Sequence, residues 1–262
     1  MLFRSDVVNL VRGKRGTVVR LKVLAAGAAA PKVYDITRAK IDLQNAEIRA
    51  EVLAVRRKGD SAERKIGVIR VPSFYADMEA MRKGAKDFKS VTRDCKALLD
   101  GFRLQNVDAV VLDLRNNGGG HFPEIVSMVG LFIEKGRAVQ VKNKDGRIEQ
   151  LDDKEEGVAW SGPLVVLVNT LTASGAEIFA AAIQDHNRGV IIGDESTAGK
   201  TGVFSLLALN ETEQWGVVKL LSQALYRPGG DSLQQQAVRS DVDLPSVLGR
   251  VKAQEGQQVG RQ

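Results

Sequence analysis

A nearly all-apolar run leads directly into a glycine-rich turn in residues 109–120, which read AVVLDLRNNGGG. Strands covered on both faces lose the alternation of apolar and polar residues, so Ala109–Leu114 indicates a central strand of a sheet. A second run of this kind is Leu164–Val168. Helical patterns follow the two runs, over about 123–134 and 174–185. Buried strands that alternate with helices predict an α/β fold.

Other elements are placed by the periodicity of their apolar residues. Lys65–Val71 predicts a strand that ends at Pro72. Apolar residues at helical spacing over 78–104 predict one long amphipathic helix. Further strands are expected near 138–150, at Val190–Ile192, near 203–209 and near 215–225.

The N-terminal part is organised differently from the rest. Residues 5–11 predict a short helix and 17–24 an alternating strand, followed by small residues over 25–31. A helix and a strand of this size cannot bury a core alone. We therefore expect four parts, which are a fragment over 1–27, a linker over 28–45, the main domain over 46–250 and a polar tail over 251–262.

Composition narrows the class of protein. The chain has 262 residues, of which 44% are hydrophobic, so it can bury a sizeable core. Its formal charge is +6 and its pI about 9.4, but Lys and Arg are spread along the chain among Asp and Glu. Basic clusters such as residues 12–15 lack interleaved aromatics, so we expect no nucleic-acid partner. The single Cys95 excludes an internal disulfide, and no apolar run is long enough to span a membrane.

The glycines of the first turn, Gly118, Gly119 and Gly120, admit two interpretations. Glycine loses more conformational entropy on ordering than other residues, so three in a row need a reason. One is a tight turn from strand to helix. The other is a set of backbone N–H groups that face an anion or a developing oxyanion, with a helix N-terminus behind them. The glycines alone do not decide between these two.

The turn after the second apolar run places Ser174 where the chain passes from strand to helix. With Glu177 three residues on, the pattern is that of a capping box, in which Ser174 is only an N-cap. A nucleophile at the same place would gain from the helix N-terminus and from the N–H of Gly175 as an oxyanion donor. The two interpretations are compatible, because Glu177 can cap the backbone while Ser174 reacts.

A serine nucleophile needs a base, and two acidic or basic neighbours are excluded by geometry. Asp185 and His186 lie on the helix that Ser174 begins, and a rise of about 1.5 Å per residue puts them roughly 16–18 Å away. We expect Asp185 to be a structural partner of Arg188 or of a nearby backbone turn. His186 is expected at the surface.

Two other residues remain as bases. His121 follows the glycines and could approach Ser174, so a Ser–His pair stays open. Lys200 lies beyond the next short strand, and a return past the sheet end can bring it beside Ser174. A free lysine has a pKa of about 10.4, so a lysine base has to be buried enough to lose its proton near neutral pH. The residues alone favour an exposed lysine.

The segment Gly193–Thr201 also resembles a phosphate-binding P-loop, with Asp113 as the strand-borne magnesium ligand. The spacing does not fit, because five residues instead of four separate Gly193 from Gly199. The residues after Thr201 predict a strand, whereas a P-loop opens a helix. A nucleotide-binding α/β protein is therefore the less favoured alternative.

Several segments taken together resemble the tail-specific, or carboxyl-terminal processing, serine proteases. They are residues 113–120 (DLRNNGGG), 162–168 (GPLVVLV), 173–185 (ASGAEIFAAAIQD) and 197–200 (TAGK), with further likeness over 66–75 and 226–245. The resemblance implies a crotonase-like α/β core that cleaves proteins at or near their C-termini through an acyl-enzyme, without a cofactor.

The same resemblance implies roles for single residues. Ser174 is the nucleophile and Lys200 the base of a Ser–Lys dyad. The candidate oxyanion donors are Gly118, Gly119 and the N–H of Gly175, and the supporting residues are Glu177, Asp185 and Thr197.

The resemblance also bears on domains, partners and location. It implies that residues 1–27 are the C-terminal remnant of a PDZ domain. The implied partners are the C-terminal tails of protein substrates, with an adaptor protein as a further candidate. The implied location is periplasmic or otherwise exported, although no signal peptide follows Met1.

Two departures from the family pattern bear on activity. The segment between Asp185 and Lys200 is one residue longer than the resemblance leads us to expect. The family usually has Gln four residues after the lysine, where it orients the amine, and this chain has Phe204. A catalytically impaired, peptide-binding member of the family is therefore the alternative interpretation.

Overall fold

The computed structural model describes residues 10–27, 29–39, 47–56, 58–59, 62–85, 87–153, 157–210, 216–234, 236–244 and 246. The chain divides into two compact units, Met1–Gln44 and Asn45–Gln262, and each is described by itself. The tail expected over 251–262 lies outside the described residues, as does most of the helix expected over 5–11.

The described part of the first unit forms a two-stranded antiparallel sheet of β1 (Val18–Val23) and β2 (Lys32–Thr37). The strand expected over 17–24 is thereby confirmed. Arg20 and Asp35 are cross-strand partners and form an ion pair, with 2.6 Å between Arg20 Nε and Asp35 Oδ1. Because both side chains are exposed, this pair adds little to stability.

The linker expected over 28–45 is wrong in part, since β2 lies inside that range. The residues of β2 include Val33, Tyr34 and Ile36, which are β-branched or aromatic types that favour strands. Their pairing with β1 gives their backbone groups partners that a free linker would lack.

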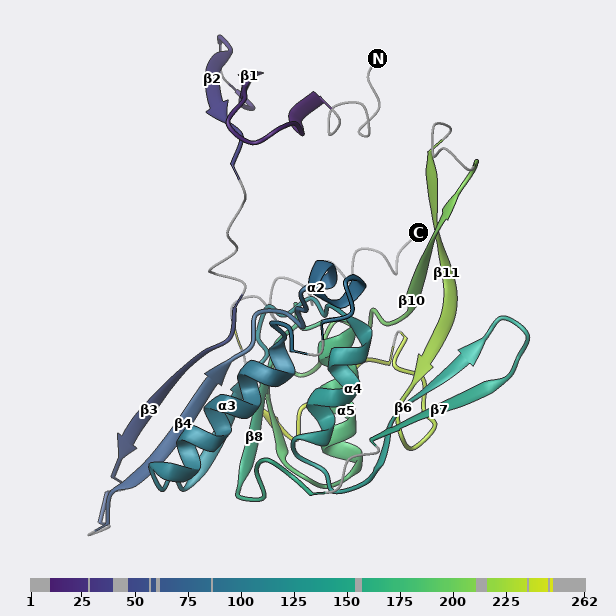
Figure 1. Cartoon of the computed structure of the whole chain (residues 1–262). Coiled ribbons are helices and arrows are strands. Elements are labelled where there is room, and N and C mark those ends of the chain that lie inside the picture. The colour runs from purple at the N-terminus through teal and green to yellow at the C-terminus, as the bar shows by residue number, and fades with distance from the viewer. Residues whose placement is uncertain are drawn as a thin grey trace. The chain divides into compact units, whose positions relative to one another are not determined.

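The second unit is built on a six-stranded sheet in the order β12-β9-β8-β5-β4-β3. Figure 1 labels β3, β4 and β8 of this sheet. The strands β4, β5, β8, β9 and β12 pair in parallel, and the edge strand β3 is antiparallel to β4. Their bounds are β3 Arg49–Val55, β4 Arg64–Arg70, β5 Ala109–Asp113, β8 Leu164–Val168, β9 Val190–Gly193 and β12 Val242–Asp243. The two apolar runs thus form neighbouring central strands, and the α/β fold is confirmed.

The core lies between one face of this sheet and the helices that cover it. The helices are α2 (Met78–Arg82), α3 (Val91–Leu104), α4 (Phe122–Gly130) and α5 (Gly175–Asp185). Figure 1 shows α3, α4 and α5 side by side on the same face of the sheet. Val110, Leu112 and Val166 point to that face and are fully buried, whereas Val111 and Val165 are only half-buried. The opposite face of the sheet is therefore the more open one.

The single long helix expected over 78–104 is wrong, because α2 and α3 are separate. Gly84 has φ +75°, a left-handed conformation that ends a helix and that glycine adopts without strain. Ser90 then caps α3, since its Oγ accepts a hydrogen bond from the Arg93 N–H at 3.3 Å. Helical spacing of apolar residues continued across this break and concealed it.

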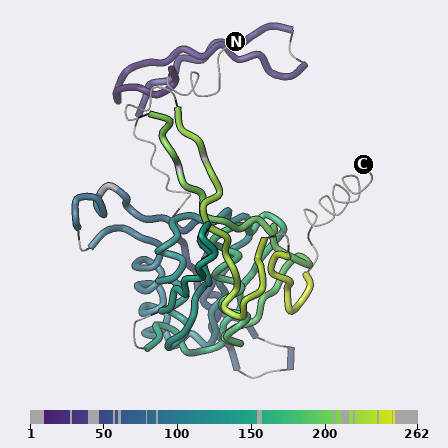
Figure 2. The backbone as a smooth tube through the Cα atoms, turned by 90° about the vertical axis from the view of Figure 1, so that its right-hand side faces the viewer, coloured from purple at the N-terminus to yellow at the C-terminus, as the bar shows by residue number. Residues whose placement is uncertain are grey.

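A smaller antiparallel sheet has the order β10-β11-β6-β7. Its bounds are β6 Gly136–Asn143, β7 Ile148–Asp153, β10 Val203–Ala208 and β11 Val217–Tyr226, close to the ranges expected from the sequence. Figure 2 shows the β10–β11 hairpin extending from the body of the second unit. Phe204, Leu207 and Leu221 on this hairpin are more than half exposed.

Candidate active site

Ser174 lies between β8 and α5, at the end of the loop that follows the central strand. Its backbone has φ 57° and ψ −119°, a combination that residues other than glycine avoid. An ordinary N-cap serine lies in the β region instead. A strained strand-to-helix turn is the arrangement that exposes a serine hydroxyl in nucleophile elbows. The backbone therefore favours a reactive serine over a simple cap.

Hydrogen bonds to neighbouring loops hold this strained turn. The Ser174 N–H donates to the Lys200 carbonyl at 3.0 Å and to the Glu177 carboxylate at 2.9 Å. The Ala173 N–H donates to the Asn117 carbonyl at 2.9 Å. A strained residue of this kind costs about 1–3 kcal/mol and persists only where its surroundings over-determine it. The hydrogen bonds to Lys200, Glu177 and Asn117 fix the turn in this way.

Glu177 is fully buried and joins the serine turn to the segment that carries Lys200. Its carboxylate accepts hydrogen bonds from the N–H groups of Ser174, Gly199 and Lys200 and from the Thr197 hydroxyl, at 2.6–3.0 Å. A buried carboxylate is costly unless hydrogen bonds compensate it, and these donors supply that compensation. The structure thus brings Glu177 and Thr197 together beside Ser174.

The glycine-rich turn lies directly against the serine. Gly119 has φ +99°, and a Cβ built on it would lie 3.1 Å from Ser174 Oγ and 2.8 Å from Gly175 N. The Gly119 N–H already donates to Asn117 Oδ1 at 2.8 Å, and a Cβ on Gly118 would meet nothing within 4 Å. The Gly175 N–H, in the first turn of α5, has no acceptor among the described residues. Gly118 and Gly175 are therefore the oxyanion candidates whose N–H groups have no acceptor among the described residues.

Lys200 is brought beside Ser174 through its backbone. Its carbonyl accepts from the Ser174 N–H, and its own N–H donates to Glu177 at 3.0 Å. Its side chain is exposed, and within the described ranges no hydrogen bond joins Nζ to Ser174 Oγ. Val203–Ala208 after it form a strand and not a helix, which excludes the P-loop interpretation.

Neither histidine is hydrogen-bonded to Ser174 in the part of the chain that the structure describes. His121 precedes α4, and its Nδ1 is buried without a hydrogen-bond partner among the described residues. His186 caps the C-terminus of α5, and its Nε2 lies 2.8 Å from the Arg137 carbonyl oxygen. His186 is therefore half-buried and not the plain surface residue that we expected.

Asp185 is held by other structural elements, as expected, but its partner is not Arg188. It forms an ion pair with Arg227, with 3.0 Å from Arg227 Nε to Asp185 Oδ1, and accepts the Gly229 N–H at 3.0 Å. Arg188 instead donates to backbone carbonyls, among them that of Trp160 at 2.6 Å. Burial lowers the pKa of Arg188 below its usual value. The backbone-turn part of the expectation is thus correct and the Arg188 part is wrong.

Asn117, for which no role was predicted, shapes the site from inside. Its side chain is fully buried, with Oδ1 accepting from Gly119 and Nδ2 donating to the Val71 carbonyl at 2.7 Å. It therefore ties the glycine turn to the end of the neighbouring strand. The available signal was a pair of asparagines between an apolar strand and glycines, where short polar side chains bond to nearby backbone.

Among the described residues, no group of three or more His, Cys, Asp or Glu side chains is placed to hold a metal ion. Among the helices in that part of the chain, none is long and apolar enough to cross a membrane.

Known proteins resemble this chain over most of its length. The profile of peptidase family S41 matches residues 65–244. The tail-specific protease of Haemophilus influenzae is 34% identical over 249 residues, which cover 93% of this chain and 33% of that protein. The carboxy-terminal-processing protease of Bartonella bacilliformis is 29% identical over 245 residues, which cover 93% and 51%. The chain thus spans between a third and about half of these curated relatives.

A solved structure agrees with the sequence matches. The photosystem II D1 C-terminal processing protease superposes with a TM-score of 0.64 at 26% identity, covering 91% of this chain and 58% of that one. The structure of mature CPAF, at 16% identity and a TM-score of 0.59, shares the fold. Because the family profile covers well over half of the sequence, the chain belongs to peptidase family S41.

Proposed function

We propose that this chain is the core of a serine endopeptidase that cleaves proteins at or near their C-termini, with Ser174 as nucleophile and Lys200 as base. The strained backbone of Ser174, between the glycine turn and the unengaged Gly175 N–H, is the observation that carries this proposal. The names of the relatives, which are tail-specific and carboxy-terminal-processing proteases, support the class of substrate.

In the proposed reaction, Lys200 Nζ takes the proton of Ser174 Oγ as that oxygen attacks the carbonyl carbon of the scissile peptide bond. The Gly175 N–H, at the N-terminus of α5, stabilises the negative charge on the carbonyl oxygen. Lys200 gives its proton to the leaving amine, and the acyl group stays on Ser174. The Lys200 amine then deprotonates a water molecule, which attacks the acyl group, releases it and restores the serine.

The exposed side chain of Lys200 sets a requirement on this reaction. Ser174 and Glu177 fix the Lys200 backbone, so rotation of its side chain alone has to bring the amine to the serine. The neutral amine is the form that can accept a proton, and removal of water favours it. We propose that a substrate bound over Ser174 and Lys200 excludes water and brings the Lys200 amine to the Ser174 hydroxyl.

Cleavage assays on casein and on a C-terminal tail peptide test the proposal. Ser174→Ala should lower kcat by on the order of 10³-fold or more, because the acyl-enzyme cannot form. His121→Ala and His186→Ala should stay largely active. Turnover by Ser174→Ala close to that of the parent chain would rule out the proposed nucleophile.

The exposed Lys200 and the presence of Phe204 favour a second candidate, a peptide-binding member that has lost efficient catalysis. Such a protein would bind the tail peptide without cleaving it. Labelling by a fluorophosphonate separates the two candidates, since an activated Ser174 reacts covalently and an unactivated one does not.

We propose further that residues 1–27 derive from a PDZ domain and that the protein is exported, as the resemblance of its motifs to the carboxyl-terminal processing proteases implies. The β1–β2 pair is the described part of the first unit that bears on this origin. A fusion that places a complete PDZ domain before residue 28 should lower KM for tail peptides with a free carboxylate more than for amidated ones. Equal KM changes would argue against tail recognition by that domain.

A further inference from the structure

A cavity of about 610 Å³ opens at the carboxyl ends of β4, β5, β8 and β9. Its described lining includes neither Ser174 nor Lys200. The lining combines apolar side chains, among them Val71, Leu167 and Ile192, with polar and charged ones. Open α/β sheets bind ligands in crevices at this end of their strands, and the volume is within the range of small-ligand pockets.

The acidic groups of the cavity already have partners. Asp113 accepts two hydrogen bonds from Arg115, from Nε at 2.8 Å and from Nη2 at 2.7 Å. Asp194 is buried and accepts two backbone N–H groups, at 3.0 and 2.9 Å. Glu47 is ion-paired with Lys89 at 2.6 Å. These carboxylates therefore offer a ligand few free acceptors.

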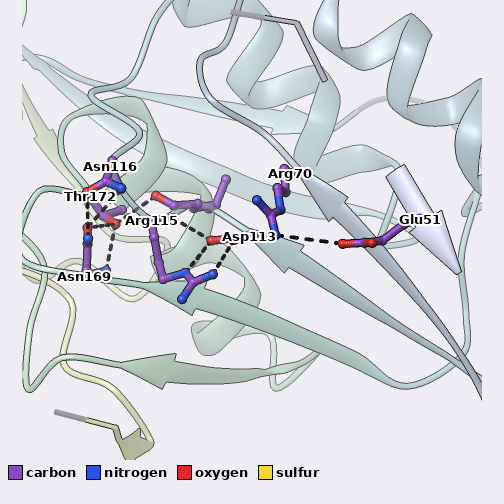
Figure 3. Close-up of polar contacts among 8 residues, drawn as sticks. Glu51, Arg70, Asp113, Arg115, Asn116, Asn169 and Thr172 are labelled. Carbon is purple, nitrogen blue, oxygen red and sulfur yellow. Dashed lines mark hydrogen bonds and ion pairs between the residues drawn. The ribbon is translucent and has the colours of Figure 1, made fainter. Parts of the chain in front are cut away.

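Two of the basic groups, by contrast, have donors to spare. Arg70 pairs with Glu51 only at 3.8 Å, which is beyond hydrogen-bond distance. Arg115 uses Nε and Nη2 on Asp113, and its Nη1 has no partner among the described residues. The two side chains are 64% and 48% exposed. Figure 3 shows them on either side of Asp113.

We propose that this cavity binds a carboxylate attached to an apolar body, with Arg70 and Arg115 as its donors. A guanidinium matches a carboxylate with two parallel hydrogen bonds, a geometry that lysine cannot reproduce. The lining holds as many acids as arginines, so the attraction comes from the unfilled donors and not from net charge. The apolar lining selects the body beside the carboxylate.

The cavity shares a wall with the loop that positions the nucleophile. Asn116 and Asn169 line it and hydrogen-bond each other in both directions at 2.9 Å (Figure 3). The Asn169 N–H also donates to Thr172 Oγ1 at 2.9 Å, close before Ser174 in sequence. A ligand on Arg115, the neighbour of Asn116, therefore acts on the turn that holds the serine.

The test measures binding to the Ser174→Ala chain, so no probe is cleaved and the outcome does not depend on the proposed protease activity. The probes are fluorescein-labelled apolar hexapeptides of one sequence. One ends in a free carboxylate, one is amidated, and one is amidated with an internal glutamate. Hexanoate serves as the competitor that represents small carboxylates. Arg70→Gln should raise the Kd of the free-carboxylate or the glutamate peptide at least about tenfold, since it removes a charge-assisted hydrogen bond.

The matched control is Arg64→Gln, which removes an exposed arginine from the same face of β4 at the opposite end of the strand. It should leave every Kd unchanged. If Arg70→Gln weakens binding of the free-carboxylate peptide alone, the ligand is a chain end, and if it weakens binding of the glutamate peptide alone, the ligand is an acidic side chain. If hexanoate displaces the peptide at concentrations below the Kd of that peptide, the ligand is a small carboxylate. Equal Kd values for the amidated and carboxylate peptides, or for Arg70→Gln and the parent, overturn the proposal. Hydrogen exchange over 169–173 should slow when the tighter peptide is bound.

Discussion

The site has a serine side, which is the turn around Ser174, and a lysine side, which is the segment around Lys200, and the structure holds the first far more firmly than the second. Around Ser174 the backbone is strained, bonded to two loops and packed against Gly119. Among the described residues, the hydrogen bonds of Lys200 are made by its backbone, its side chain is exposed, and the chain beyond it enters the exposed hairpin that carries Phe204. The fold thus holds the proposed nucleophile and the proposed oxyanion donor in place, whereas the proposed base would be positioned when substrate binds.

The largest expected effect comes from removing the group that joins the two sides. Glu177→Ala leaves the Thr197 hydroxyl and the N–H groups of Gly199 and Lys200 without their acceptor, at about 1–3 kcal/mol each. We expect the free energy of unfolding to fall by about 3 kcal/mol or more in urea titrations. Lys200→Ala, an exposed substitution, should change it by less than about 0.5 kcal/mol. Equal losses in the two variants would contradict the contrast between the sides.

We expect Asp185 to contribute to the stability of the fold and to have no direct part in cleavage. Asp185→Asn weakens the ion pair with Arg227 and leaves the guanidinium partly unpaired, so unfolding should become easier by about 2 kcal/mol. Thermal unfolding and cleavage below the unfolding range are the two readouts. If cleavage vanished while thermal unfolding stayed the same, Asp185 would have a direct role that its place at the far end of α5 does not allow.

Phe204 tests whether the lysine side lacks an orienting group. Phe204 cannot hydrogen-bond the amine, so Phe204→Gln should raise kcat on the order of tenfold with little change in KM. Phe204 is 52% exposed, so the change should cost little stability. The control is Leu221→Gln on the paired strand opposite, which should leave kcat unchanged. A fall in kcat with Phe204→Gln would mean that Phe204 serves packing or that Lys200 is oriented by another residue.

A smaller, pH-dependent effect is expected on the serine side. Burial favours the neutral acid at Asp194, but hydrogen bonds from Ser246 and Thr170 outweigh it and hold the pKa of Asp194 below its ordinary value. A lowered folded pKa gives stability that is present above about pH 4 and is lost as pH falls through the folded value. Asp194→Asn should therefore be about 1 kcal/mol less stable than the parent at pH 6, with the gap closing towards pH 3 in urea titrations. A stability difference that stays the same from pH 6 to pH 3 would contradict the lowered pKa of Asp194 as its cause.

The central strands and the serine turn could be predicted because their signals are local. The runs Ala109–Leu114 and Leu164–Val168 lack polar residues, and the pattern from Ser174 to Glu177 is short. Each of these elements depends on residues close in sequence. The predictions of β5, β8 and α5 were confirmed for that reason.

The contacts that the sequence could not predict are long-range. Nothing near Asp185 in sequence indicates Arg227, and nothing near Glu177 indicates that Gly199 will donate to it. The edge strand β3 was missed because its residues face solvent and carry mixed charge, so no buried face imposed a pattern. The break at Gly84 was missed because helical spacing continues across it.

The claim that Lys200 is the base of Ser174 is tested most directly by the pH dependence of kcat/KM for a tail peptide. The parent chain, Lys200→Ala and His121→Ala are compared over the same pH range. We predict a rate that rises with pH in the parent and in His121→Ala, because a general base has to be in its unprotonated form to act. Lys200→Ala should be at least about 10²-fold slower and should lack that rise. Parent-like turnover by Lys200→Ala, or loss of the rise in His121→Ala, would contradict the account.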